Sequence, residues 1–263
     1  MSESSSQHSE TVRLSGIALT LPTMDAPWAW LSLGWRDMWR TPSLSLGYGL
    51  VFVLIGLGGT VGLWLLDAAA LVPVVAAGFA LVGPVFAVGL YEISRRQEAG
   101  QSVSLGGILR MRVAAPVQVA FIAFLLMFIY LVWLRSATLL YALFTYGNFM
   151  PLGDFVAFVL TTPEGIAMMV IGSMIGALLA LIAFAISAIS IPLLMRKDID
   201  AMTAMSASIE VVMDAPGPML LWAWLIVVLI LFGVATLFVG LIFVFPLIGH
   251  ATWHAYRSIV ADA

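Results

Sequence analysis

Long apolar runs, broken by short polar or basic segments, dominate this chain of 263 residues. A helix that crosses a membrane needs about 20 mostly apolar residues. Runs of that length predict six spans, the last two joined by a tight turn near 233–236: residues 44–66, 71–91, 116–134, 165–195 and, as a pair, 219–256. The pattern therefore predicts an all-α membrane protein with six transmembrane helices.

Two shorter segments also repeat apolar residues at helical spacing. In residues 26–40, Trp28, Trp35 and Trp39 share a stripe beside arginines, as in a helix that lies in the lipid headgroup layer. An amphipathic helix packed on protein has the same periodicity and is the alternative. A second amphipathic helix is expected at 198–214, with four residues on its apolar side: Ile199, Met202, Ile209 and Met213.

The two ends of the chain are polar and predict tails. Residues 1–25 are rich in Ser and Thr and lack the basic start and apolar core of a signal peptide, so we expect a flexible cytoplasmic tail that a partner would order. Residues 260–263 are expected to form a short C-terminal tail. The transmembrane domain would then cover residues 26–259, with its amphipathic helices on the cytoplasmic side.

The distribution of basic residues predicts the orientation. Six spans place both termini and the loops after spans two and four on one side of the membrane. That side receives ten of the basic residues: Arg13, Arg36, Arg40, Arg95, Arg96, Arg110, Arg112, Arg196, Lys197 and Arg257. Only Arg135 falls on the other side. The positive-inside rule therefore places both termini in the cytoplasm.

Prolines recur at similar places in successive pairs of spans. Three of them come just before the first span of a pair, and three lie one to two turns before the end of the second: Pro42, Pro116 and Pro216, then Pro84, Pro192 and Pro246. This arrangement predicts three helical hairpins of similar plan, as pseudo-repeats.

Composition supports the membrane assignment and excludes several classes of protein. Hydrophobic residues make up 62% of the chain and charged residues 10%, against about a quarter charged in a typical soluble domain. Cysteine is absent, which excludes disulfides and thiolate chemistry. Phosphate-loop and nucleotide-binding glycine motifs are also absent. Nucleic acid is not an expected partner, because the basic residues flank the membrane spans.

The two histidines outside the N-terminal tail are the strongest candidates for a metal or haem site. His250 and His254 are four residues apart, so both imidazoles project from one helix face. Glu92 occupies the matching place in the second span of the predicted repeat and is a third candidate ligand. The alternative is that the histidines anchor the helix at the membrane surface among neighbouring aromatic residues.

Small residues at helical spacing mark places where helices approach closely. Gly172-x-x-x-Gly176 and Gly58-x-x-x-Gly62 each follow this pattern. Packing within the chain and contact with another subunit both fit it. Together with the stripe of three tryptophans, Gly172 and Gly176 are the interface candidates.

Several segments resemble a family of bacterial membrane proteins catalogued as domain of unknown function 2189. They are Gly34 to Met38 with Pro42 and Gly47 to Gly49, then Asp198 through Ser206 to the run Pro218 to Ala223, and finally Pro246 to Arg257. The likeness extends over about residues 26–259. It implies a bacterial inner-membrane protein of about this size, and it brings no established activity.

These observations favour a non-catalytic accessory or assembly subunit of a larger inner-membrane complex, respiratory or otherwise energy-converting. Membrane lipids and such a complex are the expected partners. A transporter of small solutes or lipids is the second hypothesis, although no span carries a charged residue near its middle. A metal- or haem-handling protein that uses the histidine pair is the third. No enzyme activity is expected, because no nucleophile and base can be paired.

Overall fold

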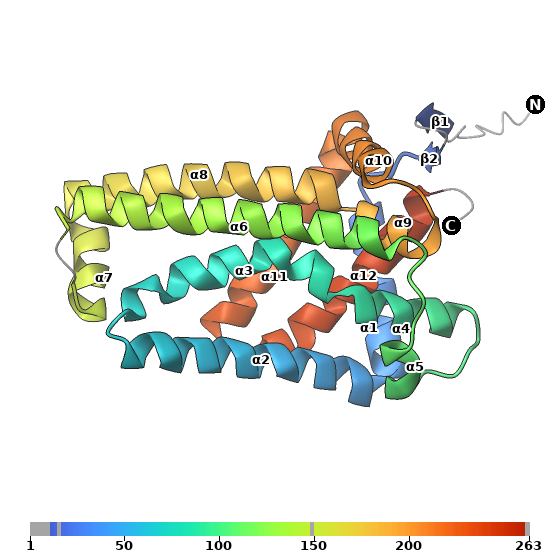
Figure 1. Cartoon of the computed structure of the whole chain (residues 1–263), viewed down its shortest axis with the longest axis horizontal. Helices are drawn as coiled ribbons and strands as arrows, with labels where there is room; N and C mark the ends of the chain where they lie inside the picture. The colour runs from blue at the N-terminus through green and yellow to red at the C-terminus, as the bar shows by residue number, and fades with distance from the viewer. Residues whose placement is uncertain (1–10, 15–16, 148–149, 261–263) are drawn as a thin grey trace, which may run out of the picture.

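Long helices running side by side form most of the molecule (Figure 1). The computed structural model describes residues 11–14, 17–147 and 150–260. Within them, five stretches are long and apolar enough to cross a membrane: Pro42–Leu65, Ala69–Glu98, Pro116–Phe144, Pro163–Arg196 and Pro216–Ala235. They correspond to the helices α2 (Pro42–Leu65), α3 (Val72–Phe86) with α4 (Val88–Glu98), α6 (Pro116–Phe144), α8 (Pro163–Ser187) with α9 (Ser190–Arg196), and α11 (Pro216–Ala235).

The predicted sixth span is a different kind of helix. α12 (Leu241–Ile259) returns beside α11, but its second half carries His250, Thr252, His254 and Arg257, which lower its hydropathy. It is not among the five apolar stretches. Ten of its residues are buried, because it packs against α1 (Ala26–Arg40), α2 and α4. The described residues therefore contain five candidate spans, and the sixth predicted span is not confirmed, since α12 is a more polar helix that is largely covered by protein.

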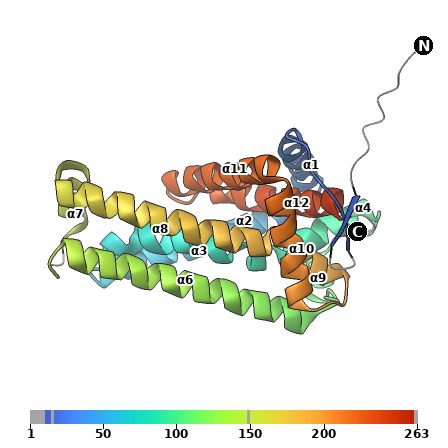
Figure 2. The ribbon, with the colours of Figure 1, turned by 90° about the horizontal axis from the view of Figure 1, so that it is seen from above.

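Packing follows the predicted hairpins only in part. In the second pair α6 packs on α8 as predicted, but α2 packs mainly on α12, and α3 packs mainly on α6. Figure 2 shows the resulting order, with α6 along one flank and α11 with α1 along the opposite flank. The plan of three similar hairpins is thus not seen in the helix contacts.

Two of the five spans are interrupted near prolines. In the second, the short helix η1 (Ala69–Leu71) precedes α3, and a break at Ala87 follows Pro84. In the fourth, the chain breaks between α8 and α9 four residues before Pro192. Proline lacks the N–H that would bond four residues back, so it weakens the helix there. Pro246 lies inside α12, which continues through it.

The segment expected as an aromatic outer loop, residues 135–163, is largely helical. α6 continues to Phe144, and α7 (Leu152–Thr161) follows it. Residues 135–144 contain no proline or glycine, so the helix continues to Phe144 and ends before a turn in which Tyr146 and Gly147 have φ of +52° and +75°.

The two predicted amphipathic helices form, but their apolar stripes face outward. In α1 the buried side holds Trp30, Gly34 and Asp37, while the three stripe tryptophans are exposed by 47–56%: Trp28, Trp35 and Trp39. In α10 (Ala201–Asp214) the buried residues include Ala204 and Val211, while Met202 and Met213 are exposed. Gly34 in α1 and Ala204 in α10 permit close packing on the buried side of each helix.

The N-terminal segment is more ordered than the predicted flexible tail. β1 (Thr11–Leu14) and β2 (Ile17–Thr20) pair as an antiparallel hairpin, and Leu19 forms a bridge with Val260. Ile17 and Leu19 are buried at 5% and 1% exposure. Their alternation with half-buried Ala18 and Thr20 is a period of two, typical of a strand with one buried face. The first ten residues of that predicted tail, and 261–263 of the C-terminal one, lie outside the described residues.

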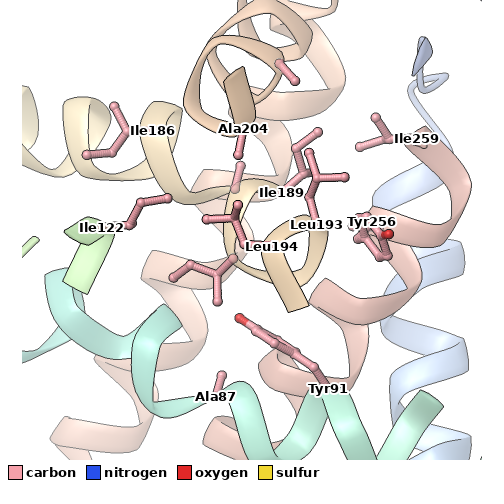
Figure 3. Packing of buried hydrophobic residues seen from close by; sticks show 14 of the residues in the cluster. Ala87, Tyr91, Ile122, Ile186, Ile189, Leu193, Leu194, Ala204, Tyr256 and Ile259 are labelled. Carbon is pink, nitrogen blue, oxygen red and sulfur yellow. The ribbon is translucent and has the colours of Figure 1, made fainter. Parts of the chain in front are cut away.

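The best-packed core lies at the end of the molecule where α4, α9, α10 and both described termini meet (Figure 3). Every residue of α9 from Ser190 to Met195 is buried. α5 (Leu105–Leu109) closes this end beside α4. Among the described residues, every Arg and Lys outside α6 and the strand β1 lies at this end, which we call the basic end. The polar contacts described below lie there too.

Candidate functional site: polar contacts around helix α12

Close backbone approach places α12 between α1 and α2. A Cβ added to Gly34 would lie 2.7 Å from the backbone nitrogen of Ala251. A Cβ added to Gly49 would meet the backbone of Ile242. Glycine at both positions therefore lets two helices touch α12 nearly backbone to backbone. Polar side chains on the three helices are brought into hydrogen-bond distance as a result.

His250 is fully buried and bonded at both ring nitrogens. The hydroxyl of Ser45 lies 3.0 Å from Nε2, and the hydroxyl of Ser94 lies 2.8 Å from Nδ1. In a neutral imidazole one nitrogen donates and the other accepts, and a serine hydroxyl serves in either role. Burial, opposed by the charge of Asp37, lowers the pKa of His250 to about 4. The imidazole is therefore neutral near pH 7 and joins α2, α4 and α12.

His254, one turn further along α12, pairs with a different residue. Its Nε2 lies 2.7 Å from Oδ2 of Asp37, which is only 3% exposed. Arg40 adds a longer contact of 3.6 Å to the same carboxylate. Burial by itself raises the pKa of the Asp37 carboxyl, but the hydrogen bond and charge of His254 outweigh it, so the pKa lies below its ordinary value. Asp37 is thus an ionised carboxylate that fixes α1 to α12.

Further hydrogen bonds surround these two contacts. Gln97 donates to the backbone oxygen of Asp37 at 3.0 Å and to Thr41 Oγ1 at 2.8 Å. Glu98 accepts from Trp253 Nε1 at 3.2 Å and from Arg257 Nε at 3.0 Å. These bonds tie the end of α4 to α1 and to α12.

Glu92, the third predicted ligand, points to another group of residues. Its carboxylate accepts from Arg95 Nε at 2.6 Å and from Arg96 Nε at 2.7 Å. Its side chain is 5% exposed, and both arginines are on the same helix, α4. Both carboxylate oxygens are therefore engaged by guanidinium groups, and no histidine is bonded to them.

The three predicted ligands do not converge on one point. His250 is held by two serines, His254 by Asp37, and Glu92 by two arginines. Within the described part of the chain, no group of three or more His, Asp or Glu side chains is arranged to hold a metal ion. The histidine pair is on one helix face as predicted, and its observed contacts are those of a packing network.

The sequence pattern did not identify Asp37, Ser45 and Ser94 as partners of the histidines. Asp37 lies in the first amphipathic helix and was not among the predicted site residues. A signal for its burial exists, because Trp30, Gly34 and Asp37 recur at spacings of four and three residues. Ser94, His250 and Asp37 lie near one another, but Ser94 and His250 have no exposed surface. A substrate has no access to them, so the arrangement does not support acyl transfer.

The predicted interface residues have two different surroundings. The indole rings of Trp28, Trp35 and Trp39 are exposed, and the last two contact each other edge to face with centroids 5.6 Å apart. Gly172 and Gly176 face α6 instead. A Cβ on Gly176 would lie 2.8 Å from the ring of Trp133, and one on Gly172 would lie 3.7 Å from Leu140. This glycine pair is therefore used inside the chain.

Two cavities lie at opposite ends of the described spans. An apolar one of about 280 Å³ is lined by the last turns of α2 and by the start of α3, including Trp64 and Pro73. The other, of about 350 Å³, lies at the basic end and is lined by Glu92, five arginines and two methionines. Neither is lined by residues from the middle of a span, so neither supports a passage across the membrane.

One comparison with known proteins finds a family model that matches part of the chain. Curated proteins give no match to the chain, and solved structures give none either. A family model described as predicted integral membrane protein (DUF2189) matches residues 71–196, which contain the second, third and fourth candidate spans. The matched segment lies between the motifs that first carried the resemblance and is shorter than the 26–259 expected. Over residues 71–196 the chain matches the DUF2189 family of predicted integral membrane proteins, and this match confirms the family resemblance.

Proposed function

We propose that this protein is a non-catalytic subunit of a larger membrane complex and that α2 contacts the partner. The supporting observation is an open small-residue face on α2. Added Cβ atoms on Gly47, Gly58 and Gly62 would meet nothing within 4 Å. By contrast, the pair Gly172 and Gly176 is already covered by α6.

The face extends along most of α2. Residues 47, 51, 54, 58, 62 and 65 lie within about 80° of one another on a helix with 100° per residue. All except Gly62 are exposed, with Val51 at 51% and Leu54 at 61%. Lipid tails cover an apolar face at no cost in free energy. The apolar character of this face alone therefore does not indicate a partner. Glycines four residues apart favour a second helix, because they permit close contact between backbones.

The proposed membrane and orientation rest on the distribution of basic residues. We place the protein in the inner membrane of a bacterium, with the basic end in the cytoplasm. The distribution of arginine supports this, since Arg135 lies 19 residues into α6, or about 28 Å from the start of that helix at the basic end. Respiratory and other energy-converting complexes are the first partners to test.

The test is purification of tagged protein in a mild detergent, followed by native-gel mass analysis and peptide identification. The expected result is one membrane protein in stoichiometric amount. The variant Gly58→Leu/Gly62→Leu is expected to lose it, whereas Gly153→Leu, at an exposed glycine of α7 with nothing within 4 Å, is expected to keep it. Protein that purifies alone under gentle conditions, or retention by both variants, would contradict the proposal.

A further inference from the structure

The cavity at the basic end has an unusual charge. Its polar lining consists of one carboxylate and five guanidinium groups: Glu92, Arg95, Arg96, Arg110, Arg112 and Arg196. The formal charge is therefore +4. Glu92 pairs with Arg95 and Arg96, so the carboxylate does not compensate the other three arginines.

The remaining three arginines have no ion pair within the described part of the chain. No carboxylate lies within salt-bridge distance of Arg110, Arg112 or Arg196, and all three are exposed. Three guanidinium groups around one cavity repel each other unless an anion lies between them. An arginine fork bonds a phosphate through two parallel N–H donors.

The walls of this cavity are fixed to one another. Arg96 donates to the backbone oxygen of Gly107 at 3.1 Å, which holds α5 against α4. The backbone nitrogens of Ala114 and Ala115 donate to Met195 and Leu194 at 3.1 and 3.0 Å, which holds the segment after α5 against α9. Figure 1 shows these segments together at the basic end. The backbone segments that carry the arginines are therefore held around the cavity by hydrogen bonds.

The position of the cavity indicates where its ligand comes from. It lies where three candidate spans end, at Glu98, Pro116 and Arg196, which is the level of the lipid headgroups. Met111 and Met195 give it an apolar side next to the charges. Basic pockets between spans at a membrane surface suit anionic headgroups, which offer a phosphate and an adjoining apolar chain.

We propose that this cavity is a binding site for a phosphate group, and that the phosphate belongs to an anionic phospholipid. The site is separate from the α2 face and does not depend on the proposed partner. Free inorganic phosphate has the same charged group without the apolar chain, so the two sources are distinguishable.

Native mass spectrometry of the full chain in detergent tests the proposal, with phosphatidylglycerol, cardiolipin, phosphatidylcholine or inorganic phosphate added in turn. We expect saturable binding of the two anionic lipids and at least tenfold weaker binding of phosphatidylcholine. Arg110→Gln/Arg112→Gln is expected to weaken anionic-lipid binding roughly tenfold or more. These arginines are exposed and unpaired, so the variant should fold.

The matched control is Arg36→Gln, which is compared with Arg112→Gln alone, because it removes the same charge from the same end of the molecule but outside the cavity. It is expected to bind anionic lipid within about twofold of the wild type, because general attraction to a basic surface falls off within about 10 Å. Equal losses in both variants would overturn the proposal, as would equal binding of phosphatidylcholine. Binding of phosphate without lipid would keep the anion site but overturn the lipid as its source. Unchanged thermal unfolding midpoints would show that both variants are folded.

Discussion

His254 Nε2 lies 2.7 Å from Oδ2 of Asp37, and this contact joins the first helix of the protein to its last. The two residues are 217 positions apart in the chain. Because the carboxylate is almost inaccessible to solvent, its free energy depends on the imidazole of His254, together with Ser94, His250 and the longer contact to Arg40. The stability of the basic end should therefore be sensitive to either residue.

Asp37→Asn is expected to lower the free energy of unfolding by about 1–3 kcal/mol, because it removes a buried carboxylate that is hydrogen-bonded to His254. His254→Gln keeps a hydrogen-bond donor and should cost less, about 1–2 kcal/mol. Thermal unfolding in detergent measures both. The exposed Arg36→Gln is the control and should change stability by less than about 0.5 kcal/mol. Equal stability of Asp37→Asn and wild type would mean that the contact does not hold α1.

The neutral state of His250 predicts a loss of stability in mild acid. Its pKa is about 4 in the folded protein, against about 6.5 in the unfolded chain, so between these values the unfolded state binds more protons. The contribution is fully present above pH 6.5 and decreases as pH falls toward 4. A difference of about 2.5 pKa units corresponds to roughly 3 kcal/mol.

His250→Asn isolates this contribution, since asparagine does not titrate and its amide can keep the hydrogen bond to Ser94 at the position of Nδ1. Unfolding midpoints of both proteins at pH 7.5, 6.5, 5.5 and 4.5 give the comparison. The wild type should lose stability more steeply than the variant between pH 6.5 and 4.5. Asp37 and His254, the nearest titratable groups, are present in both proteins, so their effect largely cancels. Parallel curves would show that His250 is protonated as easily in the folded as in the unfolded protein.

The two glycine pairs should respond in opposite ways to leucine. Gly176→Leu places a side chain against the ring of Trp133, where a Cβ already has only 2.8 Å, so we expect a loss of about 1–3 kcal/mol or more. Gly58→Leu adds a side chain to open space and should leave the isolated protein as stable as before, or slightly more stable through higher helix propensity. Thermal unfolding of the two variants under identical detergent conditions makes the comparison.

The sequence predicted the helical membrane class, four of the spans to within a few residues at most ends, and both amphipathic segments. These features depend on long or periodic local patterns, which dominate where a helix is long. The tryptophan stripe of α1 is exposed, as a helix in the headgroup layer requires, and it does not pack on protein as the alternative had it. In water the apolar side of a helix is buried, but beside lipid the bulky apolar side can remain outside while small residues pack inward.

The candidate site was only partly predictable for a related reason. His250 and His254 share a helix face because of their spacing, which is a local property. Their partners Ser45, Ser94 and Asp37 come from three other helices, and which residue meets which depends on the close approach at Gly34 and Gly49. The charge of Glu92 was visible in the sequence. The ion pairs of Glu92 with Arg95 and Arg96 were predictable, because residues three and four positions apart are neighbours on the surface of α4.

The exposed tryptophans of α1 give the last prediction. Trp28, Trp35 and Trp39 are 47–56% exposed on one side of a helix that lies at the basic end, and indole rings favour the headgroup layer. In vesicles that contain lipid brominated near the headgroup, their fluorescence should be quenched. The deeply buried Trp30, Trp222 and Trp253 should be protected from such quenching.

Replacing the three exposed residues by phenylalanine should therefore remove much of the shallow quenching. Lipid brominated deep in the acyl chain should still quench this variant, because Trp64 and Trp224 remain exposed at 68% and 64%. Unchanged shallow quenching would mean that α1 lies away from the membrane surface.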